Sequence, residues 1–266
     1  MIKTRAIVLH RFPYSDSSFI VKALTEECGI ISFIVKGGKK KESPFRGALD
    51  PLALSEVVFR QNPNTELQFI KEATLLGWRK DLRNDLLSLA KAQVMAEMIM
   101  RYAPQGVPLQ EEFERLEEAL SEFDTTSADS NSTNSATSMS ASETSPHPTH
   151  KSNIFAQWLL DTCDMWGYNL DLETCSRCGK TLDQPAADFF PETGGFICHA
   201  CLGVETPRAR TETLDGLWAL RCRQQIEHPE FTENALLAYL RHHIGFLKEI
   251  HSIKFLNETR KLFPSI

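Results

Sequence analysis

The sequence predicts a multidomain β + α protein, in which a small β-barrel is followed by an all-helical domain that carries an inserted zinc ribbon. Three observations lead to this prediction. Strand patterns succeed one another over the first 80 residues, and helical periodicity begins only at Asp81. Farther along, four cysteines form two Cys-x2-Cys pairs with 19 residues between them, a spacing typical of zinc ribbons: Cys175, Cys178, Cys198 and Cys201.

The strand patterns of the first part lie at residues 4–10, 19–25, 30–36, 52–60 and 67–76. The connections between them contain turn-forming residues, such as Pro13-Tyr14-Ser15-Asp16 and Asn62-Pro63-Asn64. Five consecutive antiparallel strands are too few for a β-sandwich, and they match a small, partly open barrel such as the OB-fold. We therefore expect a five-stranded OB-fold barrel over residues 1–80.

Residues 81–266 follow a helical pattern instead. Leu82, Leu86, Leu89 and Met95 fall on one broad stripe, which ends before Pro104. Similar stripes recur farther along the chain, and the methionines on the first one are expected in the core. The sequence thus predicts helices at residues 81–102, 109–123, 153–166, 214–227 and 232–256.

One segment of the helical part has a different composition. Of the 28 positions in residues 125–152, 15 are Ser or Thr, and large apolar residues are almost absent. Such a segment cannot bury enough apolar surface to offset the entropy lost on ordering. We expect it to be a disordered insertion between two helices, whose deletion would leave folding intact.

The cysteine pairs lie within residues 173–204, where two short apolar arms flank the turn Gly194-Gly195. This hairpin would bring the second pair back to the first around one Zn²⁺ ion. Because four thiolates leave no coordination position for water, the zinc is expected to be structural and not hydrolytic. The alternative, a redox dithiol, lacks the thioredoxin-like strand and helix that such a site needs. His199 is not expected to be a ligand.

The charge of the chain is unevenly distributed. The net charge is -6 overall, but residues 1–80 carry 13 Lys and Arg against 8 Asp and Glu, about +5, and the remainder is about -11. A polyanion would be attracted to the first part and repelled by much of the second. A chance distribution of surface charge is the alternative interpretation.

A basic loop follows the third predicted strand. Five cations occupy eleven positions around Gly37-Gly38: Lys36, Lys39, Lys40, Lys41 and Arg46. Lysine and arginine attract phosphates through counterion release, and glycine lets the backbone approach them closely. We predict that this loop contacts nucleic acid, with a solvated loop of no binding function as the alternative. Phe12 and Phe45 could stack on bases, whereas strand alternation places Phe33 in the core. Three further cations could extend the basic face: Lys3, Arg5 and Arg11.

The sequence contains no catalytic motif. The phosphate-binding pattern Gly-x4-Gly-Lys-Ser/Thr is absent, as are Gly-x-Ser-x-Gly and His-Glu-x-x-His. We therefore expect no enzymatic activity. No apolar run approaches the roughly 20 residues of a membrane span, and no secretory leader is recognised, so a cytoplasmic protein that does not enter a membrane is expected.

Several sequence features together resemble one family. They are the start Lys3-Thr4-Arg5-Ala6-Ile7-Val8-Leu9, the basic loop with the following Phe45-Arg46-Gly47-Ala48-Leu49-Asp50-Pro51-Leu52, the run Trp166-Gly167-Tyr168-Asn169-Leu170-Asp171-Leu172, and Phe189-Phe190-Pro191 with Gly194-Gly195 before Cys198. In this combination the chain resembles RecO, a family of bacterial recombination mediators. The similarity covers nearly the whole chain except the Ser/Thr-rich insertion, which departs from the family pattern.

The resemblance implies a non-enzymatic protein of DNA repair and homologous recombination. Such proteins bind single- and double-stranded DNA, anneal complementary strands, engage the acidic C-terminal tail of single-strand-binding protein, and work with RecR to load the RecA recombinase. Such a protein would be cytoplasmic and associated with the nucleoid. By position, the DNA contacts would be Lys36, Lys39, Lys40 and Arg46, and the zinc ligands would be the four cysteines. Two alternatives stay open: a zinc-ribbon scaffold for protein contacts, and an RNA-binding OB-fold protein.

Overall fold

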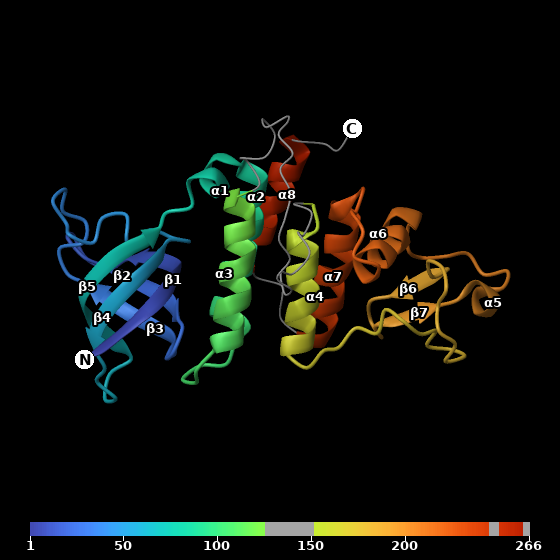
Figure 1. Cartoon of the computed structure of the whole chain (residues 1–266), viewed down its shortest axis with the longest axis horizontal. Coiled ribbons are helices and arrows are strands. Elements are labelled where there is room, and N and C mark those ends of the chain that lie inside the picture. The colour runs from blue at the N-terminus through green and yellow to red at the C-terminus, as the bar shows by residue number, and fades with distance from the viewer. Residues whose placement is uncertain (126–151, 245–249, 263–266) are drawn as a thin grey trace, which may run out of the picture.

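Alternating inward-facing apolar residues close the first five strands of the chain into a barrel (Figure 1). The computed structural model describes residues 1–125, 152–244 and 250–262. The barrel strands are β1 (Ile2–Pro13), β2 (Phe19–Thr25), β3 (Gly29–Val35), β4 (Leu54–Arg60) and β5 (Leu67–Gly77). Their order is β1-β2-β3-β5-β4, and β1 pairs with β4 to complete the ring. The expected OB-fold barrel is confirmed, and it is closed.

One strand pair departs from the expected antiparallel pattern. Residues Ser32 to Ile34 of β3 run parallel to Leu67 to Phe69 of β5. A closed ring of five strands cannot alternate in direction all the way round, so one pair must be parallel. Inside the ring, Phe33 and Phe59 meet edge to face with their ring centroids 5.0 Å apart. Phe33 is fully buried, as its place in the strand predicts.

The helices form a layer beside the barrel, in which α2 contacts β1 and α3 contacts β2 (Figure 1). They are α1 (Lys80–Asn84), α2 (Leu86–Tyr102), α3 (Gln110–Thr125), α4 (Ile154–Met165), α6 (Thr211–Arg221), α7 (Pro229–Ile244) and α8 (His251–Leu262). One core joins the two parts, because Leu24 and Ile30 from the outside of the barrel belong to the same buried cluster as Met95 and Met98. Among the described helices, none is long and apolar enough to cross a membrane.

Three predicted helices have different boundaries in the structure. The first is divided at Asp85, whose extended backbone starts α2 and whose carboxylate accepts a hydrogen bond from the Leu87 N–H. The helix predicted at residues 214–227 ends at Arg221, before Arg223 adopts a left-handed φ of 55°. The helix predicted at residues 232–256 is two helices, α7 and α8. The Ser/Thr-rich insertion lies, except for its first and last residues, outside the described residues.

The zinc-ribbon segment lies at the far side of the helices from the barrel (Figure 1). It contains β6 (Asp188–Phe190), β7 (Gly195–Ile197) and the single-turn helix α5 (His199–Leu202). The two strands pair antiparallel, and Phe189 stacks on Phe196 at 4.7 Å between ring centroids. The predicted hairpin around the two glycines is therefore present.

Candidate functional site

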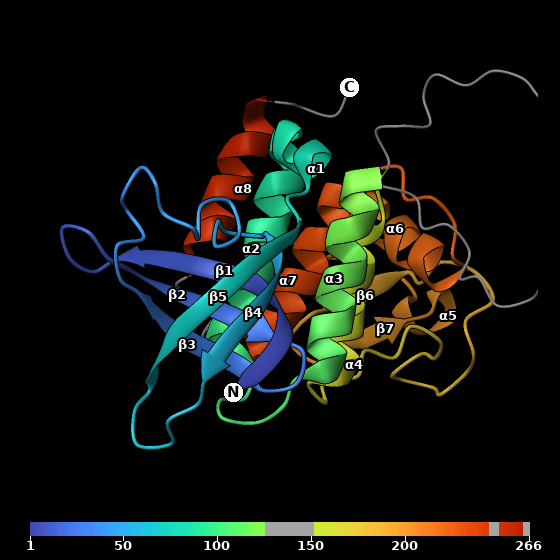
Figure 2. The same cartoon turned by 60° about the vertical axis from the view of Figure 1, so that its left-hand side comes forward.

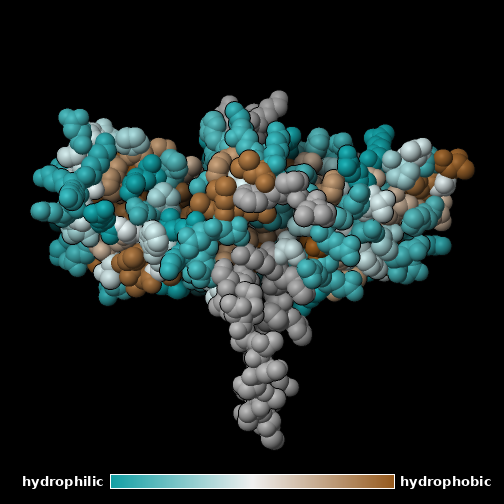
Figure 3. All heavy atoms as spheres, turned by 90° about the horizontal axis from the view of Figure 1, so that it is seen from above, coloured by the Kyte–Doolittle hydropathy of each residue, from teal (hydrophilic) through white to brown (hydrophobic). Residues whose placement is uncertain are grey.

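The basic loop and the β1–β2 connection together form a groove at one end of the barrel. Figure 2 shows the two loops side by side, on the side of the barrel away from α3 and α4. The groove has a volume of about 630 Å³. Most of its charged lining is cationic, and the full lining consists of Arg11, Pro13, Phe19, Gly38, Lys39, Lys40, Lys41, Arg46 and Asp50. Seen from above in Figure 3, the barrel end of the molecule is largely hydrophilic.

The groove depends on two adjacent glycines. Gly37 has a φ of 69°, in the left-handed region that favours glycine. A Cβ on Gly38 would lie 2.3 Å from the ring of Phe19, so the backbone can approach that ring only without a side chain. The Lys39 N–H then donates to the Ser17 carbonyl at 3.1 Å, and its ammonium donates to the Ser15 carbonyl at 2.5 Å. The basic loop is thus fixed against the neighbouring connection.

Most cations of the groove have no carboxylate partner. Among the described residues, Lys40, Lys41 and Arg46 are exposed and form no ion pair. Arg11 is the exception, because its guanidinium lies 2.8 Å from the Asp50 carboxylate. The same guanidinium stacks over the Phe19 ring at 5.1 Å. Asp50 is therefore largely neutralised by Arg11, and the other cations stay available to an anion.

Not every predicted cation belongs to the groove. Lys36 lies outside its lining, with its ammonium 5.0 Å from the centre of the Phe69 ring on β5. Lys3 is paired with Glu56 at 2.9 Å, and Arg5 is paired with Glu26 at 2.5 Å. These two cations lie outside the groove lining and are paired with carboxylates of β4 and of the β2–β3 turn, so their contribution to a basic face stays a prediction.

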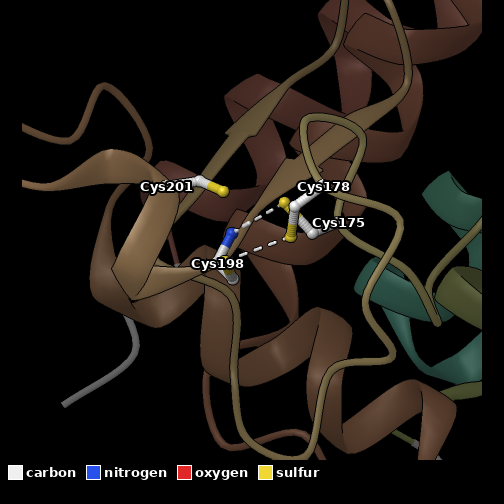
Figure 4. A group of neighbouring side chains, drawn as sticks. All are labelled: Cys175, Cys178, Cys198 and Cys201. Carbon is white, nitrogen blue, oxygen red and sulfur yellow. Dashed lines mark hydrogen bonds between the residues drawn. The ribbon is translucent and has the colours of Figure 1, made fainter.

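The four cysteines converge at the ribbon (Figure 4). Their sulfur atoms all lie within 4.8 Å of one another, and those of Cys178 and Cys198 are 3.9 Å apart. A zinc ion with Zn–S distances of about 2.3 Å requires sulfurs about 3.8 Å apart. The cluster can therefore hold a metal ion. His199 is not a member of it and faces solvent.

The backbone around Cys175 favours its thiolate, the form of cysteine that binds metals, whereas hydrogen bonding to the sulfurs of Cys178 and Cys198 raises the pKa of Cys201. Burial would raise the pKa of Cys175, but the N–H groups of Cys198, Cys178 and Arg177 lower that pKa to about 6. The N–H of Cys198 donates to the Cys175 sulfur at 3.4 Å. Such hydrogen bonds stabilise negative charge on sulfur before any cation is bound. Four thiolates with no open position suit a structural metal.

The run from Trp166 to Leu172 connects α4 to the metal cluster. Gly167 ends the helix with a φ of 78°, and Tyr168 donates its N–H to the Cys163 carbonyl at 2.7 Å. The Tyr239 hydroxyl of α7 donates to the Tyr168 and Asn169 carbonyls at 2.9 and 3.2 Å. These bonds hold the entrance of the ribbon against the helical layer.

A buried carboxylate holds the other end of the ribbon. Asp188 is almost fully buried and accepts hydrogen bonds from the N–H groups of Arg208 and Ala209, the latter at 2.8 Å. The chain that leaves the ribbon toward α6 is thereby fixed to β6. Asp188 carries no distinctive sequence signal, because one aspartate before two phenylalanines resembles an ordinary strand end.

Comparison with known proteins matches both parts of the chain. The family model of the recombination protein O N-terminal region matches residues 1–79, and that of the C-terminal region matches residues 146–254. The chain belongs to the RecO family. Three relatives are each named DNA repair protein RecO. That of Syntrophobacter fumaroxidans is 26% identical over 97% of both chains. That of Anaeromyxobacter sp. is 25% identical over 98% of both chains. That of Cutibacterium acnes is 27% identical over 82% of this chain and 81% of its own.

Membership of the RecO family connects the two candidate sites. The match to the N-terminal region covers the barrel with its basic groove, and the match to the C-terminal region covers the cysteine cluster. Phe19 and Asp50 were not predicted as groove residues, because contacts across the barrel end bring them there. Phe69 was not predicted to contact Lys36, because its only sequence signal is an aromatic residue in the last predicted strand.

Proposed function

We propose that this RecO-family protein is a recombination mediator that binds single- and double-stranded DNA, anneals complementary strands, and helps to load the RecA recombinase onto gaps coated by single-strand-binding protein. The observation that carries the proposal is the groove at the barrel end. Its unpaired cations converge from one loop, and the family supplies the link to DNA repair.

The groove suits the phosphates of an extended backbone. Lys40, Lys41 and Arg46 offer several positive charges along the loop. Gly38 has no side chain, so the loop backbone packs closely against the Phe19 ring. Counterion release from a nucleic acid would drive binding irrespective of base sequence. Lys36 and Lys39 would contribute further contacts, the first from beside the groove.

The proposed activity needs no bond to be made or broken. Two DNA strands repel each other through their phosphates, and a cationic surface that contacts both lowers this repulsion. Base pairing then supplies the free energy of annealing. We therefore infer that the protein is not an enzyme and acts by holding strands close together.

Cys175, Cys178, Cys198 and Cys201 would hold one Zn²⁺ ion, which would stabilise the ribbon as a structural ion. The arrangement of thiolates supports zinc, because a closed tetrahedral sulfur site is typical of that metal. The ribbon within residues 173–204 would then be a rigid extension of the helical domain of residues 81–266, beside the DNA-binding domain of residues 1–80.

RecR and the acidic C-terminal tail of single-strand-binding protein are the proposed protein partners, on the strength of family membership. The protein would act in the cytoplasm, associated with the nucleoid.

A strand-annealing assay tests the proposal. Two complementary oligonucleotides are mixed with the native protein, or with the variant Lys39→Ala, Lys40→Ala, Lys41→Ala, Arg46→Ala. The native protein should accelerate duplex formation, and the variant should not, while its circular dichroism stays native. Equal annealing by both proteins, or no annealing by the native one, would refute the proposed activity. Acceleration restricted to RNA strands would favour the RNA-binding alternative.

A further inference from the structure

Four apolar side chains form a continuous row across the outside of the barrel. The strand registers pair Phe12 of β1 with Ile20 of β2, Ile20 with Ile34 of β3, and Ile34 with Phe69 of β5. We call Phe12, Ile20, Ile34 and Phe69 the apolar row. Directly opposed residues on neighbouring strands lie side by side on one face of a sheet, so these four residues make one surface.

The row faces outward from the barrel. The neighbours of Ile20 and Ile34 along their strands, Val21, Phe33 and Val35, are fully buried in the barrel core, and side chains alternate along a strand. Phe12 is 37% exposed and Phe69 is 58% exposed. The row is thus accessible to a ligand.

The same outer face is covered by helices at its other end. Leu24 and Ile30 are also paired in register, and both are buried in the core shared with α2 and α3. A polar pair, Lys22 and Ser32, separates them from the apolar row. The fold therefore uses one apolar part of this face for its own packing and leaves a second one uncovered.

Cations surround the uncovered row. The Lys36 ammonium lies 5.0 Å from the centre of the Phe69 ring, and Arg60 is directly opposite Phe69 in the β4–β5 register. Lys22 lies one pair farther along β2. None of these three cations forms an ion pair with another described residue. The acidic residue of β5 itself, Glu72, is paired with Lys71 at 3.4 Å.

We propose that the apolar row is a stacking surface for the unpaired bases of single-stranded DNA, whose phosphates lie along the surrounding cations and the groove. This inference rests on the proposed function and adds to it the preferred form of DNA. A ligand for this surface must combine flat apolar faces with negative charge. Only unpaired bases present such faces, because a duplex hides them within its stack, so the row favours single strands while the groove binds both forms.

Two double substitutions distinguish stacking of bases on the aromatic rings from simple apolar contact with the bases. Phe12→Leu, Phe69→Leu removes both rings but keeps apolar side chains, and Phe12→Tyr, Phe69→Tyr keeps both rings in the same positions. Affinity is measured for three ligands of equal length: oligothymidylate, an abasic strand with the same phosphates, and a blunt duplex. Stacking is worth about 1–3 kcal/mol per base.

We expect the leucine variant to lose about tenfold in affinity for oligothymidylate, and the tyrosine variant to bind as the native protein does. Neither variant should change affinity for the abasic strand or the duplex. Native binding of oligothymidylate by the leucine variant, or an equal loss for all three ligands, would overturn the inference and leave the proposed function standing. A native protein that binds none of the three ligands would overturn both.

Discussion

The barrel and the ribbon, at opposite ends of the molecule, are stabilised in different ways (Figure 1). The barrel has a core of its own with large side chains, among them Phe33 and Phe59, and every strand is paired on both sides. The ribbon has two strands of three residues each and a small cluster of its own, Ala187, Ile197 and Leu202, while its larger side chains Phe189 and Phe196 belong to the core shared with the helices. The cluster that the ribbon forms alone offsets little of the entropy lost on ordering the segment.

Because of this difference, the side chains that stabilise the fold are of different kinds in the two regions. In the barrel, apolar packing fixes the fold, so the polar loops at its end are free to carry cations for a ligand. In the ribbon, the Asp188 carboxylate fixes the exit of the segment, and the four cysteines would fix the remainder once they hold a metal ion. Substitutions should therefore have opposite consequences: in the ribbon, polar changes should affect stability, and in the barrel loops, they should affect affinity.

Loss of one zinc ligand should have the largest effect. Structural zinc sites contribute roughly 10–16 kcal/mol of binding free energy to folding, so Cys178→Ser should release the metal and unfold the ribbon. Metal content and protease cleavage within residues 173–204 measure this directly. The matched control is Cys222→Ser, an exposed cysteine outside the cluster, which should keep its zinc. Full metal content in Cys178→Ser would disprove the metal site.

A core substitution in the barrel should come next. Phe33→Ala removes a fully buried ring in contact with Phe59 and should cost about 3–5 kcal/mol of unfolding free energy. Urea denaturation measures the loss, and zinc content should stay unchanged. Phe69→Ala, on the outside of the same barrel, should lose less than about 1 kcal/mol. A drop in zinc content in Phe33→Ala would show that the two regions are not independent.

A polar substitution in the ribbon should have a somewhat smaller effect. Asp188→Ala leaves the N–H groups of Arg208 and Ala209 without their acceptor, at a cost of about 2–4 kcal/mol. Thermal denaturation of the zinc-loaded protein measures it. The control Asp183→Ala, an exposed aspartate of the same segment, should melt as the native protein does. If both variants melt alike, Asp188 does not hold the ribbon.

Acidification should have the smallest effect, at the contact between α2 and α8. Burial raises the pKa of Glu97, but the Ser252 hydroxyl and the N–H groups of Ser252 and His251 lower it below its ordinary value of 4.5, with help from Arg101. A lowered pKa in the folded state adds stability that is present above the unfolded pKa and is lost as pH falls through the folded pKa.

Comparison with Glu97→Gln therefore isolates this contribution. The native protein should be more stable than the variant at pH 7, and the difference in urea midpoint should shrink as the pH falls below about 4.5. A difference that stays constant down to pH 3 would mean that the Glu97 charge does not anchor α8.

The sequence predicted those parts of the structure that depend on local pattern. The five strands and the helices follow from hydrophobic periodicity, and the convergence of the four cysteines follows from their spacing. Both signals depend on residues that lie close together in the sequence. The helix breaks at Asp85 and Arg223 were missed, because an apolar stripe continues through a single capping residue or left-handed residue. The parallel β3–β5 pair was missed because it follows from closing the ring.

The loop that carries the candidate site was predictable from the sequence, whereas the long-range contacts of its residues were not. Clustering of lysines around Gly37-Gly38 marked the loop, and the structure brings Lys39, Lys40, Lys41 and Arg46 to one groove. The place of Lys36 beside Phe69, and the pairing of Arg11 with Asp50, depend on contacts between residues 33 and 39 positions apart. Charge counting cannot distinguish a paired cation from an unpaired one.

The salt dependence of binding to single-stranded DNA tests the central claim most directly. Each cation that a substitution removes from a phosphate should flatten the slope of log affinity against log salt by about 0.7. Lys39→Ala, Lys40→Ala, Lys41→Ala, Arg46→Ala should therefore flatten it by up to about 2.8. The control Lys180→Ala, Arg241→Ala, Lys254→Ala, Lys261→Ala removes four exposed cations elsewhere and should retain the native slope. Equal slopes for the native protein and the groove variant would contradict the claim that this groove binds phosphates.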